Sequence, residues 1–292
     1  MEFCIICNQK VLAAPETGRA RSNVRAFAHE VFALWRCPAC QSIHARDEVE
    51  LERYYASYPF HQLKGSRSNR MLALMYRNLL RRLTSHGFGA TSSLLDYGCG
   101  SGHFLEYCRD AGYHRVYGYD AYSSAFQSRS ILDDRYDVVL SQDVMEHVPS
   151  PREHMRALGR LVKPGGIIAV GTPNASAIDL ARPERGIHAL HQPYHRHIVS
   201  GAALQEMGQE LGFRLVRYYP TMYANTRWPF VNSAFVLHYY RCFDNNADLA
   251  VQPPSLSSWR LWSPATLWLG LLGSFFAPKT DVMAVFAVGS QG

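Results

Sequence analysis

The chain has 292 residues, of which 47% are hydrophobic and 18% are charged, and its formal net charge is +6. This is enough apolar sequence to bury one α/β core with smaller accessory pieces. The basic residues are scattered, which argues against a nucleic-acid-binding arm. Because the first residues lack the basic and long apolar segments of a signal peptide, we expect a cytoplasmic protein with reduced cysteines.

Two Cys-x-x-Cys pairs stand near the N-terminus: Cys4 with Cys7, and Cys37 with Cys40. Each pair can present two thiolates from a tight turn, and four thiolates complete a tetrahedral zinc site. Such a closed site leaves no open position for chemistry, so the zinc would be structural. The apolar alternation over residues 24–37 predicts strands, and residues 1–45 are expected to form a small zinc ribbon.

Residues 46–90 show a helical pattern and are expected to form a cover or linker before the core. Met71, Met75, Leu79 and Leu83 recur every four residues and give an apolar stripe. The aromatic stretch 54–62 is a candidate lid, with plain helix packing as the alternative.

The sequence LLDYGCGSGHF (94–104) predicts a buried strand that runs into a glycine turn and then a helix. Gly98, Gly100 and Gly102 carry no Cβ, so the backbone of the turn can lie against a ligand, and the helix start presents free N–H groups. Asp120 ends the next strand pattern, where a carboxylate can accept hydrogen bonds from ribose hydroxyls. The turn and Asp120 together indicate a nucleoside-type cofactor.

From residue 91 to 220 strand and helix patterns alternate, which predicts a parallel, doubly wound sheet. The expected strands are 94–97, 115–119, 136–141, 167–171 and 213–219, and the expected helices are 103–111, 151–162 and 201–211. The glycine turn, Asp120 and residues 141–147 all fall at the carboxyl ends of strands, where such sheets bind ligands. Residues 281–292 are expected to supply a last strand at the sheet edge.

With these features the chain resembles the class I S-adenosylmethionine-dependent methyltransferases, over roughly residues 90–220. Besides the glycine turn and Asp120, the resemblance rests on YDVVLSQDVMEHV (136–148), LVKPGGIIAVGTPN (161–174) and PYHRHIVSGAALQEMGQELGF (193–213). It implies a Rossmann-like fold preceded by the zinc ribbon, and S-adenosylmethionine as cofactor. It also implies cofactor contacts for Asp96, below the loop, for the glycines Gly98, Gly100 and Gly102, for Asp120 at the ribose, and for Gln142. The family fits a helix and a strand between Asp120 and residue 136, and here both must be cut short.

The stretch DVMEH carries candidate catalytic groups. Asp143, Glu146 and His147 stand at i, i+3 and i+4, so on a helical turn they would share one face and could hold a divalent cation. The stretch resembles the E-x-x-E-H of small-RNA 2′-O-methyltransferases and ubiquinone-pathway O-methyltransferases, which implies Mg²⁺. In the RNA enzymes a later histidine completes the site, and His195 stands at the matching place. Without a metal, His147 and His195 are the candidate general bases, and Glu146 would cap a helix or contact the substrate.

Residues 221–280 form an aromatic and apolar insertion. The stretch 261–277 is strongly apolar, but it is shorter than a bilayer span and is interrupted by Pro264, Gly270 and Gly273. Three interpretations are open: a helix packed on the core, a cap over a hydrophobic substrate, and an anchor on the inner surface of a membrane.

The leading functional interpretation is a methyltransferase that acts on an oxygen of a small or lipid-like acceptor. A nucleotide-linked sugar or polysaccharide is an alternative, because sugar C-methyltransferases resemble this chain in their zinc module, although they carry a further C-terminal α/β domain. An RNA 2′-O-methyltransferase is another alternative, which the weak basic character disfavours. A non-catalytic scaffold that binds S-adenosylmethionine is the last alternative for the function. The expected acceptor-pocket residues are Tyr194, Tyr218 and Tyr223.

Overall fold

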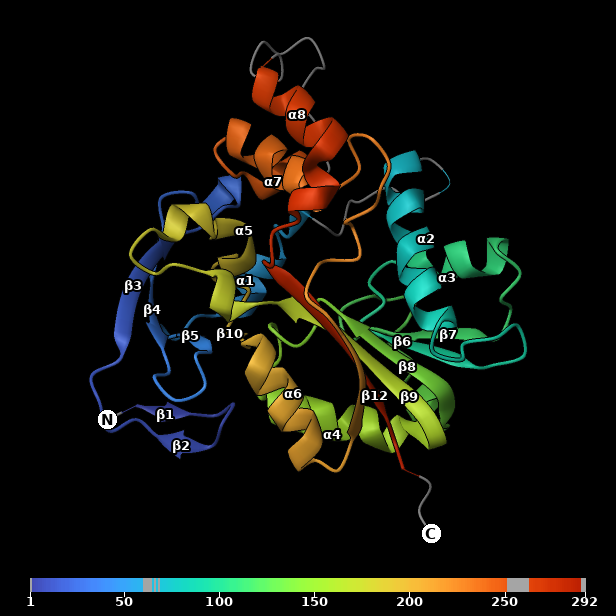
Figure 1. Ribbon diagram of the computed structural model, residues 1–292. Helices are drawn as coiled ribbons and strands as arrows, with labels where there is room; N and C mark the ends of the chain where they lie inside the picture. Colours follow the sequence, from blue (N-terminus) through green and yellow to red (C-terminus); the bar gives the residue numbers. More distant parts are fainter. Residues whose placement is uncertain (1, 60–64, 66, 68, 251–262, 290–292) are drawn as a thin grey trace.

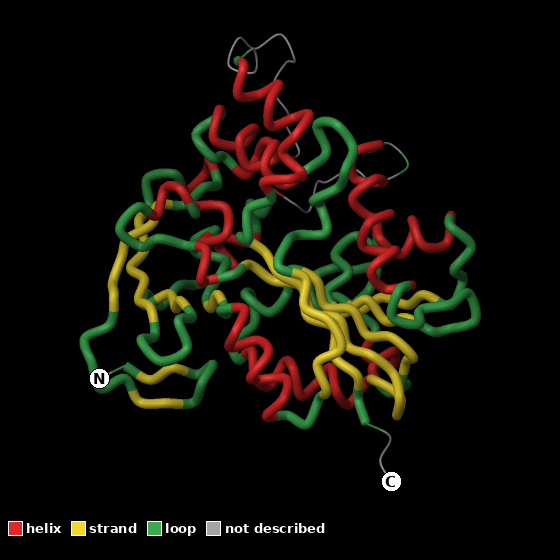
Figure 2. The backbone as a smooth tube through the Cα atoms, in the orientation of Figure 1, coloured by secondary structure: helices red, strands yellow, loops and turns green. Residues whose placement is uncertain are grey.

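The computed structural model describes residues 2–59, 65, 67, 69–250 and 263–289. Their largest sheet has six strands in the order β11-β12-β9-β8-β6-β7, with helices on both faces (Figures 1 and 2). The bounds of its strands are β6 Leu94–Tyr97, β7 Val116–Tyr119, β8 Tyr136–Gln142, β9 Val162–Pro173, β11 Arg214–Tyr219 and β12 Asp281–Ala287. This is the expected Rossmann-like α/β architecture.

The sheet is mixed, which corrects the expectation of a wholly parallel sheet. The strands β7, β6, β8 and β9 are parallel, whereas β12 is antiparallel to both β9 and β11. β12 also lies inside the sheet, and β11 forms the edge instead. Residues 282–286 of β12 are all buried, as an interior strand requires, while β11 exposes Arg214 and Arg217.

Two layers of helices cover the sheet. The helices α4 (Pro151–Leu161) and α6 (Gly201–Glu210) pack on one face, and α2 (Arg70–Thr84) and α3 (His103–Asp110) pack on the other. Ser200 caps α6 by accepting a hydrogen bond from the Ala203 N–H at 3.1 Å. The stripe of α2 buries Leu79 and Leu83 as predicted, but Met71 remains 42% exposed.

The connection from β7 to β8 is short, as the sequence predicted. It contains one 3₁₀ turn, η3 (Arg129–Leu132), and no strand, so β7 is the other edge of the sheet. All residues of this connection belong to the described part of the chain.

The N-terminal module consists of a small hairpin and a four-stranded sheet. The hairpin pairs β1 (Phe3–Cys4) with β2 (Gln9–Lys10). The sheet has the order β10-β5-β4-β3, with β3 at Glu16–Arg21, β4 at Val31–Arg36, β5 at Ile43–Ala45 and β10 at His197–Ile198. Only the second half of the alternating run 24–37 is a strand, because its first half contains the 3₁₀ turn η1 (Arg25–Phe27) and the turn that follows it.

The remaining helices lie outside these two layers, with α7 and α8 at the upper end of the molecule in Figure 1. They are α1 (Leu51–Tyr55), η4 (Ala175–Ala177), η5 (Pro183–Arg185), α5 (Ile187–Leu190), α7 (Ser233–Cys242), η6 (Ala247–Ala250), α8 (Pro264–Leu272) and η8 (Gly273–Phe276). Among the described residues, none of the helices has the length and apolar character that a membrane span needs. Residues 60–62 of the candidate lid and residues 261–262 of the apolar stretch lie outside the described part.

Candidate active site

The glycine turn connects β6 to α3 in a backbone conformation that favours glycine. Gly98 has φ +88°, and a Cβ there would lie 2.2 Å from Cγ2 of Val144. Gly102 has φ +76°, and its Cβ would lie 2.5 Å from Cζ of Phe126. Both positions therefore combine a left-handed backbone with close neighbours, so only glycine fits without movement.

Asp120 fixes the same turn from the end of β7. One carboxylate oxygen accepts a hydrogen bond from the Gly100 N–H at 2.8 Å, and the other accepts one from the Tyr122 N–H at 2.8 Å. Each oxygen keeps a second lone pair that a ribose hydroxyl could use.

Asp96 and Gln142 lie at the ends of the two neighbouring strands. Asp96 is 5% exposed, and burial together with the charge of Asp120 raises the pKa of its carboxyl to about 7. The Gln142 amide donates to Asp143 Oδ1 at 2.9 Å, but its own buried oxygen has no hydrogen-bond partner among the described residues. An unpaired buried acceptor is typical of a site that a polar ligand completes.

The prediction that Asp143, Glu146 and His147 share one face of a helical turn is wrong. Asp143 has φ +56°, and residues 145–147 form a turn in place of a helix. The group whose ligand atoms lie within 4.8 Å of one another consists of Glu146, His147 and His195, without Asp143. The Asp143 side chain is exposed, but it lies close to many protein atoms. The desolvation that they cause, followed by repulsion from Asp281, raises the pKa of its carboxyl to about 7.

Glu146 and His195 form a buried pair. Glu146 accepts a hydrogen bond from the Thr172 hydroxyl at 3.0 Å through Oε2, and its Oε1 lies 3.9 Å from His195 Nε2. Burial, and then Asp143, raise the pKa of Glu146 well above its usual value. His195 donates from Nδ1 to the Ala189 carbonyl at 2.7 Å, which leaves the lone pair of the neutral ring on Nε2. Burial lowers the pKa of His195 to about 4, so at neutral pH this nitrogen is a proton acceptor.

His147 lies beside this pair, and one of its nitrogens has a hydrogen-bond partner. Its ring meets the His195 ring edge-on, with centroids 4.7 Å apart. The Tyr55 hydroxyl lies 2.9 Å from His147 Nδ1. Burial and the neighbouring His195 hold the pKa of His147 well below its usual value, so His195 is the leading candidate of the two histidines that the sequence singled out.

The residues fit Mg²⁺ poorly. Mg²⁺ prefers an octahedral set of oxygen ligands, whereas this cluster offers one carboxylate and two imidazoles. Nδ1 of one imidazole, His147, already has the Tyr55 hydroxyl as a partner, and the second carboxylate, Asp143, stands outside the cluster.

Aromatic rings surround the cluster on the side of α1. Tyr55 stacks on Tyr122 with centroids 5.1 Å apart and 12° between the ring planes, and Tyr58 packs against Tyr194. The stretch 54–62 predicted lid aromatics, but nothing in the sequence singled out Tyr122, because its stacking partner comes from another element.

The three expected acceptor-pocket tyrosines lie in different places. Tyr194 is fully buried, and its hydroxyl donates to the Tyr54 carbonyl at 2.9 Å. Tyr223 packs near Tyr76, and burial, followed by the charge of Asp143, raises the pKa of its hydroxyl. The Tyr218 hydroxyl instead covers Gly201 at the start of α6, where a Cβ would lie 2.0 Å from it.

The four N-terminal cysteines come together as predicted. Their sulfur atoms lie within 4.8 Å of one another, with Cys4 and Cys40 3.6 Å apart and Cys7 and Cys37 3.8 Å apart. Sulfurs on a tetrahedral Zn²⁺ with bonds of about 2.3 Å lie roughly 3.8 Å apart, so the spacing fits this ion. Burial raises the pKa of the Cys7 thiol to about 11, and a bound divalent cation would reverse this effect.

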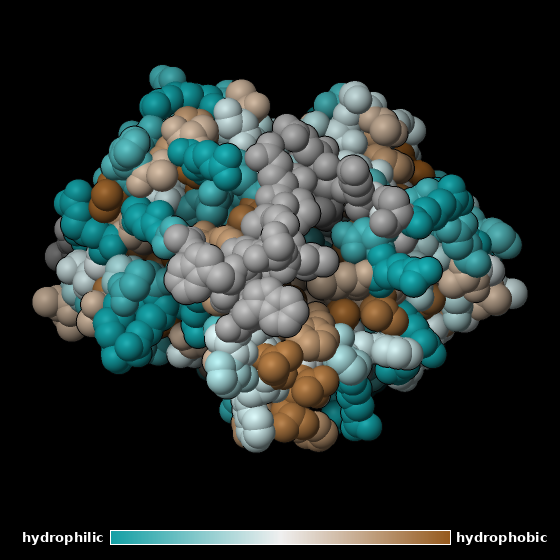
Figure 3. Space-filling model, turned by 90° about the horizontal axis from the view of Figure 1, so that it is seen from above, coloured by the Kyte–Doolittle hydropathy of each residue, from teal (hydrophilic) through white to brown (hydrophobic). Residues whose placement is uncertain are grey.

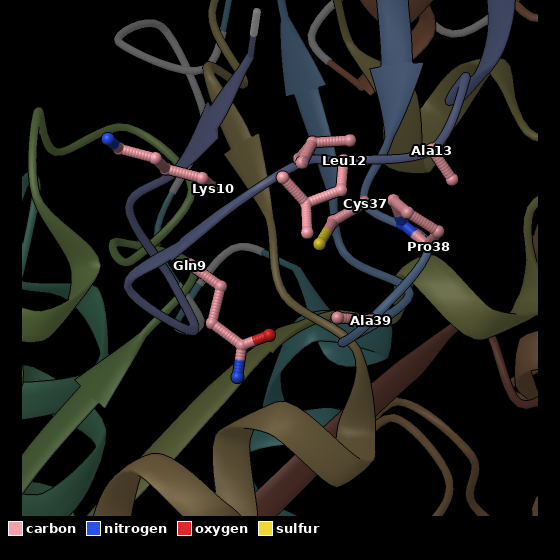
Figure 4. A pocket seen from close by; sticks show the side chains of 8 residues that line it. Gln9, Lys10, Leu12, Ala13, Cys37, Pro38 and Ala39 are labelled. Atoms are coloured by element: carbon pink, nitrogen blue, oxygen red, sulfur yellow. The ribbon is translucent and has the colours of Figure 1, made fainter.

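A surface pocket of about 320 Å³ lies on the N-terminal module (Figure 4). It is lined by residues 9–13 and 37–39, with Lys10 and Cys37 as its titratable groups. This pocket lies away from the strand ends that carry Asp96, Asp120 and Glu146, so we do not assign the chemistry to it.

Comparisons with known proteins identify the family of the chain. A family profile described as a methyltransferase domain matches residues 67–218, which is more than half of the chain. The ubiquinone biosynthesis O-methyltransferase of Aeromonas salmonicida is 30% identical over 42% of this chain and 63% of its own length. The enzyme of the same name from Maricaulis maris is 31% identical over 34% of this chain and 52% of its own length.

The chain thus spans less than two thirds of these relatives. Among solved structures, an S-adenosylmethionine-dependent methyltransferase from Archaeoglobus fulgidus overlays with a TM-score of 0.42 and 20% identity, covering 72% of this chain and 92% of that one. On the family match, this chain belongs to the methyltransferase domain family.

Proposed function

We propose that the protein transfers the methyl group of S-adenosylmethionine to an oxygen of a small or lipid-like acceptor. The observation that carries this proposal is the bare Nε2 of His195, which is buried beside Glu146 near the strand ends that carry Asp96 and Asp120. A proton acceptor next to a nucleoside-type site is what O-methylation of a hydroxyl needs. The relatives named as O-methyltransferases support the same reaction.

The cofactor would lie along the glycine turn. The Asp120 carboxylate would bind the ribose with its remaining lone pairs, and Asp96 and Gln142 would contact the rest of the cofactor. When bound, S-adenosylmethionine supplies an electrophilic methyl group on a positively charged sulfur.

His195 would remove the proton of the acceptor. The hydroxyl of the acceptor gives its proton to His195 Nε2 as its oxygen forms the new bond to the methyl carbon and the old bond to sulfur breaks. The Glu146 carboxyl, 3.9 Å away, would stabilise the imidazolium that forms when it is ionised, and the positive charge in turn favours that ionised form. The proton finally leaves to solvent, which returns His195 to its neutral form.

The face formed by α8 and η8 supports the proposals of a lipid-like acceptor and of a membrane contact. Its exposed side chains are Leu267, Trp268, Leu271, Phe275 and Phe276. Figure 3 shows hydrophobic side chains gathered on the upper face of the molecule, beside the grey segment. Residues 225–243 and 263–280 contain no Asp or Glu but include Arg227, Arg241 and Lys279. Exposed aromatics next to basic residues suit the surface of an anionic bilayer, which is where a lipid-like acceptor would be found.

Zinc would have a structural role. We infer that Cys4, Cys7, Cys37 and Cys40 bind one Zn²⁺ through thiolates and thereby hold the hairpin β1–β2 to the turn between β4 and β5.

One assay separates the candidate acceptors. Purified protein is incubated with S-adenosylmethionine and, in turn, with a prenylated dihydroxybenzene, a nucleotide sugar or a short RNA, and S-adenosylhomocysteine is measured. We expect turnover with the first acceptor, and unchanged turnover after EDTA treatment at a concentration that leaves the protein-bound zinc in place. Turnover with the sugar or the RNA alone would replace the acceptor class. Binding of S-adenosylhomocysteine without any turnover would favour the scaffold, and activity restored only by Mg²⁺ would overturn the metal-free proton transfer.

A further inference from the structure

The segment that carries His195 is part of the sheet of the N-terminal module. β10 begins two residues after His195 and pairs with β5, with His197 opposite His44 and Ile198 opposite Ile43 (Figure 1). The Ala45 N–H also donates to the Arg196 carbonyl at 2.9 Å. The module with the four cysteines is thus joined to the methyltransferase core by main-chain hydrogen bonds at the candidate active site.

Two buried histidines extend this connection to the cysteine cluster. His44 Nε2 lies 3.2 Å from Cys4 Sγ, and His44 Nδ1 lies 3.0 Å from His197 Nδ1. The His44 ring is 3% exposed and stacks on Trp35 with centroids 4.4 Å apart. The stacking on Trp35 and the edge-on contact with the His197 ring hold the His44 ring, so a movement of Cys4 would be transmitted to His197.

The same segment also contacts Glu146, through hydrogen bonds to its main-chain carbonyl. The Arg196 N–H donates to the Glu146 carbonyl at 2.8 Å, and the His197 N–H points to the same oxygen at 3.4 Å. At the end of the segment, the Ser200 hydroxyl donates to the Cys40 carbonyl at 2.6 Å. Residues 195–200 are therefore held between the cysteine cluster and Glu146.

The glycine turn is held differently. The N–H groups of the turn that donate to another strand or its end are those of Gly98 and Cys99, which donate to the Tyr119 carbonyl, and that of Gly100, which donates to Asp120. These partners all belong to β7 and its end, within the core. The cofactor side of the site can therefore remain ordered when the module does not.

We propose that the zinc-bound cysteine cluster positions the proton-accepting side of the active site through His44 and His197, independently of the cofactor side. In this role His44 and His197 are positioning residues, because they act on His195 and Glu146 and have no contact with the reacting atoms. The assignment of His195 as proton acceptor rests on the proposed function, whereas the coupling between the cysteine cluster and residues 195–200 does not.

Hydrogen exchange measured by mass spectrometry tests the coupling. The zinc-loaded protein is compared with protein stripped of zinc by a chelator and with His44→Phe at saturating zinc. Phenylalanine keeps a ring against Trp35 but removes both nitrogens. The matched control is His29→Phe, an exposed position in the same module. Calorimetry with S-adenosylhomocysteine reports the cofactor side.

We expect amides of residues 191–200 to exchange at least about tenfold faster in the stripped protein and in His44→Phe, but not in the control. Exchange over residues 94–104 and the affinity for S-adenosylhomocysteine should stay the same, and added zinc should restore the stripped protein. Unchanged exchange over 191–200 in both samples would overturn the proposal. So would equal loosening of 94–104, since that is general unfolding. If the wild type does not bind S-adenosylhomocysteine, the proposed function fails while the exchange result still decides the coupling.

Discussion

The Tyr55 hydroxyl lies 2.9 Å from Nδ1 of His147, while Nε2 of the neighbouring His195 has no hydrogen-bond partner among the described residues and lies 3.9 Å from Oε1 of Glu146. Two histidines that look equivalent in the sequence are therefore different in the fold. A hydroxyl group contacts one nitrogen of His147, whereas the lone pair on Nε2 of His195 is available.

Replacing these residues should separate their roles. His195→Gln should lower kcat with the active acceptor by roughly 100-fold or more, because the proton loses its acceptor. Tyr55→Phe should lower kcat by less than about tenfold, since it removes a contact of His147 only. The measurement is the rate of S-adenosylhomocysteine formation, with calorimetric binding of S-adenosylhomocysteine as the control for folding. A larger loss in Tyr55→Phe than in His195→Gln would assign the proton transfer to His147.

The glycine turn offers a matched pair of alanine substitutions. Gly102 and Gly112 both have positive φ, at +76° and +90°, so alanine should destabilise either position by about 1–2 kcal/mol. A Cβ at Gly102 meets the Phe126 ring, whereas nothing lies within 4 Å of one at Gly112. Gly102→Ala should therefore also weaken S-adenosylhomocysteine binding by about tenfold or more, and Gly112→Ala should not. Equal affinities of the two variants in calorimetry would mean that the turn does not contact the cofactor.

Cofactor binding should take place with proton release from Asp96. Burial and Asp120 raise the pKa of its carboxyl to about 7, above its unfolded value, and a bound cation favours the ionised form. The affinity for the cationic S-adenosylmethionine should therefore increase as the pH rises from about 5 to about 8. Calorimetry in buffers of different ionisation enthalpy measures the released proton.

Asp96→Asn is the control for this pH dependence. Asp143 titrates in the same range, so the difference between the wild type and Asp96→Asn isolates the contribution of Asp96. An identical pH dependence in both proteins would exclude Asp96 as the source of the proton.

Buried histidines should make the fold sensitive to acid. Burial lowers the pKa of His154 to about 4, below its unfolded value near 6.5. As the pH falls below about 6.5 the unfolded chain takes up the proton first, so stability present at higher pH is lost as the pH approaches about 4. When the pH falls from about 7.5 to about 5.5, the free energy of unfolding should decrease in both proteins. The decrease should be about 1.4 kcal/mol smaller in His154→Gln than in the wild type, as measured by urea denaturation. The exposed His114→Gln should match the wild type, and an equal loss in all three proteins would contradict the prediction.

The apolar face of α8 and η8 should bind anionic vesicles. Trp268 and Phe275 are 55% and 77% exposed, and inserting each ring into a bilayer buries a large apolar surface. Trp268→Ser combined with Phe275→Ser should lower binding to mixed phosphatidylcholine–phosphatidylglycerol vesicles by roughly tenfold or more, measured by co-sedimentation. Leu12→Ser, which changes an exposed leucine of the N-terminal module, is the matched control. Equal sedimentation of wild type and double variant would show that this face does not contact the membrane.

The sequence by itself determined the alternation of strands and helices, the glycine turn with Asp120, and the pairing of the four cysteines. Each of these depends on local chemistry: hydrophobic periodicity, residues without Cβ, and ligands at short spacing. The sequence could not place β12 inside the sheet. Strand order depends on which strands pair with it and which helices cover its two faces, and these partners come from distant parts of the chain.

Only the tertiary structure decided the roles of the catalytic candidates. Asp143 leaves the cluster because its left-handed backbone breaks the helical spacing that the sequence suggested. Tyr55, from α1, occupies one nitrogen of His147, and β10 joins the segment of His195 to the zinc module. These contacts connect residues far apart in the chain, and no local pattern encodes them. Packing between distant elements therefore determines which imidazole remains free to accept a proton.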